Sequence, residues 1–147
     1  MNTCYVIHHS ESKDAQYIPA HMNAFVGPID FRVLVDTGAS ISLIQGEMYD
    51  EMIKKKLISN NFKRWTGGTV RTAAENGMAV RGTTQIEIVL KGDNIRLTLE
   101  VAIINGLTKE LIMGIDVLNK LSACIDLKRR CITLDWRFTF PLDIGNE

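Results

Sequence analysis

The sequence lacks an excess of charge of either sign. Its 17 basic and 17 acidic side chains give a formal net charge of +0 at pH 7. A chain without net charge gives no electrostatic reason to expect nucleic acid or an anionic membrane as its partner. It also has no apolar run long enough to span a bilayer and no signal-peptide pattern, so we expect no membrane partner.

Cysteine and histidine are scarce, with three residues of each. The three cysteines do not have the spacing of a metal site, and their odd number is typical of a reducing compartment such as the cytoplasm. The three histidines form no zinc signature. We therefore expect a cytoplasmic protein that needs neither a metal nor a cofactor.

The residues that are present favour one mainly β domain. Apolar residues make up 46% of the 147 residues, which is enough for a single core. Three pairs of extended segments are each separated by a short turn, as in β-hairpins. The first pair lies in residues 17–36 and turns at Gly27-Pro28. The second lies in residues 86–101, where apolar and polar residues alternate, and the third lies in residues 124–134 and has a basic turn.

A fourth hairpin and two short helices complete the pattern. Asn76-Gly77 joins two extended segments, and this dipeptide is a strong hairpin signal because both residues tolerate positive φ. Residues 47–58 and residues 116–121 are the two helix candidates, and we expect Asp116 to cap the second of them.

An acid follows the most apolar of the early strands. The run Val33-Leu34-Val35 leads directly into Asp36 and then into Thr37-Gly38. Such a run is typical of a strand covered on both faces, and a carboxylate at its end is costly to desolvate unless something offsets the cost. Asp and Gly are common turn residues, so one interpretation is that Asp36 caps a turn. The other is that the acid is held there for chemistry.

Three features in a fixed order resemble the retropepsin family, the retroviral-type aspartic proteases. They are Asp36-Thr37-Gly38, the hairpin around Asn76-Gly77, and an apolar pair before a glycine, Ile112-Met113-Gly114. The closing segment, residues 113–134, is similar to that of the LTR-retrotransposon, pararetrovirus and cellular ubiquitin-pathway members of the family. The resemblance implies a retropepsin-like β-barrel with one or two short helices, active as a homodimer.

The resemblance covers most of the chain and divides it into three parts. The parts are an N-terminal arm at residues 1–16, the protease domain at residues 17–134, and a tail at residues 135–147 that is a strand end or the boundary to a following module.

The resemblance assigns the chemistry to Asp36. Hydrolysis of a peptide bond without a metal needs a general base for the water and a general acid for the leaving nitrogen, and two carboxylates that share one proton supply both. The chain carries a single Asp-Thr-Gly, so the second carboxylate must come from Asp36 of another copy on a two-fold axis. The implied function is an aspartic endopeptidase that matures a retroelement or viral polyprotein, within the cytoplasm or a virus-like particle.

The neighbouring residues take supporting roles by the same resemblance. Thr37 would bond across the dimer, Gly38 would leave room for the two loops to approach, and Ala39 would line the floor of the cleft. A flap would close over an extended peptide. Its tip is formed by Ala74, Glu75, Asn76 and Gly77.

The sequence also departs from the compact retroviral enzymes. These carry an arginine after the glycine of the apolar run, where this chain has Ile115, and often an acid where it has Ser40. A catalytically weak dimerisation or peptide-binding module of a cellular protein is therefore the alternative function. Phe140-Pro141 in the tail is of the aromatic-proline type that such proteases cut, so self-processing there is a further hypothesis.

Overall fold

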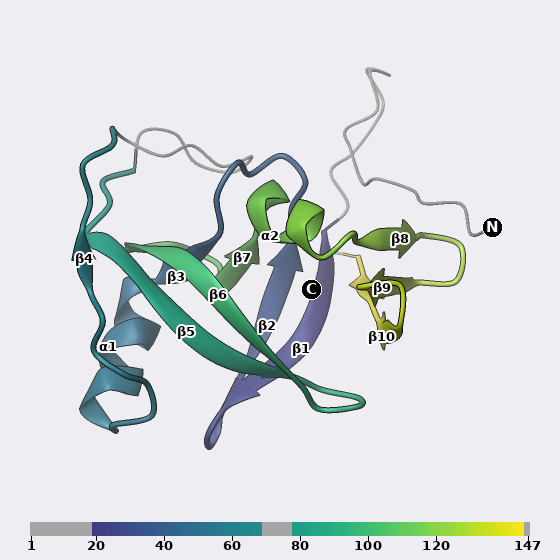
Figure 1. The fold of residues 1–147 in the computed structure, drawn as a ribbon, viewed down its shortest axis with the longest axis horizontal. Coiled ribbons are helices and arrows are strands. Elements are labelled where there is room, and N and C mark those ends of the chain that lie inside the picture. The colour runs from purple at the N-terminus through teal and green to yellow at the C-terminus, as the bar shows by residue number, and fades with distance from the viewer. Residues whose placement is uncertain (1–18, 69–77, 146–147) are drawn as a thin grey trace.

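The computed structural model describes residues 19–68 and 78–145, which fold around a closed β-barrel (Figure 1). Six strands follow one another in the order β1–β2–β7–β3–β6–β5, and β5 pairs with β1 to close the barrel. The pairs β2–β7 and β3–β6 are parallel and the others are antiparallel. The strands are β1 (Ala20–Val26), β2 (Ile29–Val35), β3 (Leu43–Gln45), β5 (Gly82–Leu90), β6 (Ile95–Ile104) and β7 (Leu111–Met113).

Shorter elements surround the barrel. The strand β4 (Lys63–Arg64) pairs with the start of β5, and β11 (Asp143–Ile144) pairs with β1. A separate three-stranded sheet, at the right of Figure 1, has the order β10-β9-β8. Its strands are β8 (Cys124–Asp126), β9 (Cys131–Leu134) and β10 (Phe138–Pro141).

Two helices complete the fold, and the predicted mainly β architecture with two short helices is confirmed. Helix α1 (Gly46–Lys54) follows β3 and packs against β3 and β6, whereas α2 (Ile115–Lys120) follows β7 directly. In the described ranges, neither helix has the length and apolar character that a membrane crossing requires.

The three described hairpins form where the sequence predicts them. β1 and β2 meet at the pair Val26 and Ile29, and Gly27 in their turn has a φ of +55°. β5 and β6 pair from Gly82 to Leu90 with buried and exposed side chains alternating along β5. The hairpin of β8 and β9 is the third. The predicted hairpin around Asn76-Gly77 lies outside the described residues, as does the N-terminal arm.

The predicted extent of the first helix, residues 47–58, is wrong at its C-terminal end. Helix α1 ends at Lys54, and Lys56 adopts a left-handed φ of +57°. The amides of Lys56 and Leu57 then donate to Ile53 and Met52, which is the bonding pattern of a Schellman motif. This motif ordinarily takes glycine at the left-handed position, so the lysine there gave no sign of a helix end.

The apolar run of β2 is covered on both faces, as its sequence predicts. Val33 and Val35 belong to the main core, which fills the barrel and includes side chains of α1. Leu34 points the other way, into a second group that we name the loop-side cluster. Its buried members are Leu34, Ala39, Leu43, Ala102, Ile104, Leu107 and Ile112.

The tail contributes strands to the domain. β10 pairs with β9, and β11 pairs with β1. The side chain of Phe140 is only 1% exposed, and the amide of Leu142 donates to the carbonyl oxygen of Arg130 at 2.8 Å. A module beyond this tail stays a prediction.

Candidate active site

The Asp36 loop, residues 36–42, joins β2 to β3 and begins at the carboxyl end of a central strand. β2 lies between β1 and β7, and the amide of Asp36 extends the ladder by donating to Met113 at 3.0 Å. The side chain of Asp36 is only 4% exposed. The barrel therefore holds this acid in a fixed position at the end of a buried strand.

The loop turns tightly around the carboxylate. The amide of Gly38 donates to Oδ1 of Asp36 at 2.9 Å, and the amide of Ala39 donates to the carbonyl oxygen of Asp36 at 3.2 Å. A Cβ on Gly38 would lie 3.2 Å from Oδ1, closer than ordinary van der Waals contact. Thr37 is half-buried and Ala39 is buried in the loop-side cluster. The four residues predicted for this loop are thus together, with a charge-assisted hydrogen bond that stabilises the carboxylate.

The apolar run Ile112-Met113-Gly114 lies directly against this loop. The amide of Ile115 donates to the carbonyl oxygen of Ala39 at 2.8 Å. A Cβ on Gly114 would lie 2.7 Å from that same oxygen and 2.8 Å from the carbonyl oxygen of Ile41. Both contacts are with backbone, which cannot rotate away. Only glycine fits at position 114, because the two chain segments approach so closely.

A polar network around the buried Ser42, which no sequence pattern predicted, ties the loop to α2. Ser42 is fully buried, and its amide and hydroxyl both donate to the carboxylate of Asp116, at 3.1 and 2.8 Å. The hydroxyl also accepts a hydrogen bond from the amide of Gly114 at 2.9 Å. The prediction that Asp116 caps the second helix is correct in one respect and wrong in another. Its carboxylate accepts a hydrogen bond from the first-turn amide of Val117 at 2.8 Å, but Gly114 holds the N-cap position and Asp116 lies in the first turn.

This network lies beside Ile115, the position at which the resemblance would imply an arginine. Ile115 is apolar and 41% exposed, so its side chain gives the loop no ionic support. The Asp116 carboxylate and the Ser42 hydroxyl supply polar support from a different pair of positions. No signal in the sequence marked them, since Asp in the first turn of a helix and Ser beside a strand are both ordinary.

Two residues beyond the predicted flap tip pack against the loop-side cluster. Ala74, Glu75, Asn76 and Gly77 lie outside the described residues. Met78 and Val80, which follow them, are partly buried against the loop-side cluster, as is Trp65. The residues that directly follow the predicted flap tip therefore pack on the cluster that contains Ala39.

The candidate site presents one carboxylate, that of Asp36. Within residues 19–68 and 78–145, no three His, Cys, Asp or Glu side chains are grouped so that they could hold a metal ion. Asp36 is a buried carboxylate at a strand end with a loop built around it. A single chain carries one such group, and acid–base catalysis by two carboxylates requires a second.

Comparisons with known proteins bear on the family and the fold of this chain. The family model for the retroviral aspartyl protease matches residues 19–126. The chain is similar to the retroviral protease-like domain of Ddi1 from Leishmania major, with a TM-score of 0.65 and 17% identity, over 87% of this chain and 96% of that one. It also matches a retropepsin-like aspartic protease from Rickettsia conorii, with a TM-score of 0.46 and 20% identity, over 75% and 83% of the two chains. The first likeness shows a shared fold.

Proposed function

Because the chain belongs to the retroviral aspartyl protease family, we propose that it is an aspartic endopeptidase. It acts as a homodimer in which each chain contributes one Asp36. Its substrate is an extended peptide, and its role is to mature the polyprotein of a retroelement or virus in the cytoplasm or in a particle.

The observation that carries this proposal is the setting of Asp36. The carboxylate is buried at the end of β2, and its loop is held by the amide of Gly38 and by the backbone contact of Ala39 with Ile115. The bond from Gly38 would also suit a turn-capping acid, but the burial of the carboxylate and the contact with the distant residue Ile115 go beyond what a turn cap needs. Preorganised groups of this kind are typical of catalytic sites.

The reaction follows from a pair of carboxylates on the two-fold axis. Like charges a few Å apart cannot both stay ionised, so the pair holds one proton, for which aspartic proteases are the known example. The ionised carboxylate takes a proton from water, whose oxygen attacks the peptide carbonyl carbon. The protonated partner donates to the leaving nitrogen as the C–N bond breaks. Hydrolysis is lost when both groups are charged or both are neutral, so the pH profile is bell-shaped.

A fluorogenic peptide library assayed from pH 4 to 7 tests the proposal. The control is Asp36→Asn, which keeps the size of the side chain and removes the titratable oxygen. We expect cleavage by the natural chain, a bell-shaped pH profile, and loss of cleavage in the variant. Cleavage that survives the substitution would refute the assignment of Asp36.

The alternative is a cellular dimerisation or peptide-binding module with weak or no hydrolysis. It is favoured by Ile115, because the compact retroviral enzymes carry an arginine at this position after the apolar run. The same assay separates the two functions, since a binding module would retain peptide in an equilibrium binding measurement without cutting it.

A further inference from the structure

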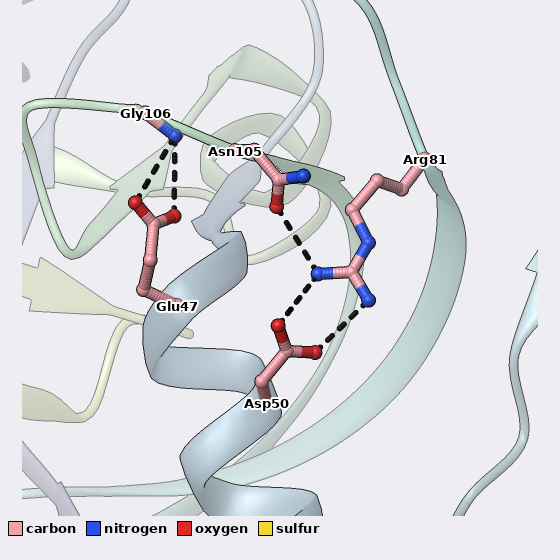
Figure 2. Close-up of polar contacts among 5 residues, drawn as sticks. All are labelled: Glu47, Asp50, Arg81, Asn105 and Gly106. Atoms are coloured by element: carbon pink, nitrogen blue, oxygen red, sulfur yellow. Dashed lines mark hydrogen bonds and ion pairs between the residues drawn. The ribbon is translucent and has the colours of Figure 1, made fainter.

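A cluster of polar side chains joins three segments that are far apart in the sequence (Figure 2). Arg81 lies immediately before β5, and its guanidinium makes two hydrogen bonds with the carboxylate of Asp50 on α1, at 3.0 and 2.9 Å. It also donates to the side-chain oxygen of Asn105, just after β6, at 3.1 Å. The ring of Tyr49 lies beneath the guanidinium, with its centroid 5.8 Å away.

A hydrogen bond from the backbone of the next residue, Gly106, lies beside these side chains. The amide of Gly106 donates to the carboxylate of Glu47 in the first turn of α1, at 3.1 and 3.3 Å, as Figure 2 shows. A Cβ on Gly46 would meet the side-chain oxygen of Asn105, so a larger residue at the start of α1 would displace Asn105 from its present position. The helix, the entry to β5 and the exit from β6 thus meet at one place.

We name the contacts of Arg81 with Asp50 and Asn105 the clamp. Its geometry is more specific than that of an ordinary surface ion pair. The two side chains are 34% and 56% exposed, and pairs with such exposure contribute little to global stability. A guanidinium that bonds a carboxylate through two parallel N–H groups fixes orientation, which a lysine cannot do. Hydrogen bonding to Asp50 raises the pKa of Arg81, so the guanidinium stays charged throughout the assay range.

The clamp follows residues 78–80 directly in the chain, and we name these three residues the flap arm, or simply the arm. Met78 and Val80 pack on the loop-side cluster, which includes Ala39. Arg81 follows directly, and its own amide donates to the carbonyl oxygen of Ile103 at 2.9 Å. Because side chains of an extended segment alternate, the apolar residues face the cluster while Arg81 faces α1. The cluster and the clamp therefore hold the arm from opposite sides.

We propose that Arg81 is a positioning residue of the active site, whose clamp onto Asp50 and Asn105 holds the arm of residues 78–80 in place over the Asp36 loop. This inference rests on the proposed function, since the arm then lies beside the bound peptide. A loose arm must be ordered each time a substrate binds, and that ordering weakens binding. The clamp therefore acts mainly on KM.

Two substitutions remove the clamp from either side, and a third serves as a matched control. Arg81→Met keeps the aliphatic length of the side chain, and Asp50→Asn keeps the shape of its partner. Arg96→Met is the control, because it breaks the exposed ion pair of Arg96 with Glu87 on the same hairpin, away from the loop. Arg81→Lys keeps the charge without the second parallel bond and is expected to fall between the natural chain and Arg81→Met.

Two readouts test the clamp. Peptide hydrolysis should show a KM raised at least ~5-fold in both clamp variants, with a smaller change in kcat. Amide hydrogen exchange of residues 79–82 should be at least ~10-fold faster in the same variants. The double variant should be no worse than either single one, because both remove the same interaction. The Arg96→Met control should match the natural chain in each measurement.

Several results would overturn the inference. Unchanged exchange of residues 79–82 in both clamp variants would show that Arg81 does not hold the arm. A fall in kcat alone, in proportion to the loss of folded protein, would assign the clamp to stability. An equal effect of Arg96→Met would remove its specificity. If the natural chain hydrolyses no peptide, the proposed function fails, and the exchange measurement alone still decides whether the clamp holds the arm.

Discussion

A buried histidine makes the stability of this domain depend on pH in the range where an aspartic protease works. His21 lies on β1 between Leu34 of β2 and Asp143 of β11, and it is only 2% exposed. Its Nδ1 atom is buried and accepts or donates no hydrogen bond within the described part of the chain. Burial lowers the pKa of His21 from 6.5 to about 4, helped by the positive charges of Arg32 and Lys109 and opposed by Asp143.

The sign and size of the effect follow from linkage. The folded state holds this histidine neutral, so the stability it allows is fully present above pH 6.5 and is lost as the pH falls from 6.5 to about 4. One pH unit corresponds to about 1.4 kcal/mol, so the loss across this window is about 3 kcal/mol. Because a domain is typically stable by only about 5–15 kcal/mol, the change is large enough to measure.

Urea unfolding between pH 7 and 4 tests this reasoning, with the natural chain compared to His21→Gln. Glutamine is polar and similar in size but does not titrate. The protein concentration must be the same at each pH, since dimer formation also contributes to stability. We expect the free energy of unfolding of the variant to fall by about 3 kcal/mol less than that of the natural chain over this range. If the free energy of unfolding fell equally with pH in the two proteins, His21 would not be the source of this pH dependence.

Three further outcomes follow from the contacts around the site. Gly114→Ala should destabilise the domain by at least ~2 kcal/mol in urea unfolding, because its Cβ meets two backbone oxygens, whereas Gly68→Ala, where a Cβ meets nothing within 4 Å, should be nearly neutral. Ser42→Ala should cost about 1–3 kcal/mol in the same measurement, because it removes the acceptor of the buried Gly114 amide and one of the donors to the Asp116 carboxylate. The Phe140-Pro141 bond should stay intact in mass spectra of incubated enzyme, because Phe140 is buried within β10; a product that ends at Phe140 would contradict this.

The sequence predicted those parts of the fold that depend on local patterns. The alternation along residues 86–101 sets the faces of β5 and β6, and the continuous run Val33-Leu34-Val35 indicates a strand with a cluster on each side. The acid at the end of that strand was identified by the same pattern. These features could be predicted because the hydrophobic pattern that determines them spans only a few neighbouring residues.

The remaining parts depend on contacts between distant segments. Ser42 and Asp116 are 74 positions apart, and Arg81 and Asp50 are 31 apart, so neither pair produces a local pattern. The early end of α1 rests on a lysine in a left-handed conformation, which local preference disfavours. Polar residues without a local pattern make contacts that only the tertiary structure decides, and here they supply the supports of the candidate site.

The most direct test of the account is to mix the natural chain with Asp36→Asn while its own amount is held constant. If the two subunits exchange freely and each active pair needs Asp36 from both, an equal amount of the variant should lower the total activity to about half, and larger amounts should lower it further. Sedimentation of the mixture confirms that mixed dimers form. Activity that stays constant as the variant is added, in a mixture shown to contain mixed dimers, would mean that one chain carries the whole site and would contradict the shared pair of carboxylates.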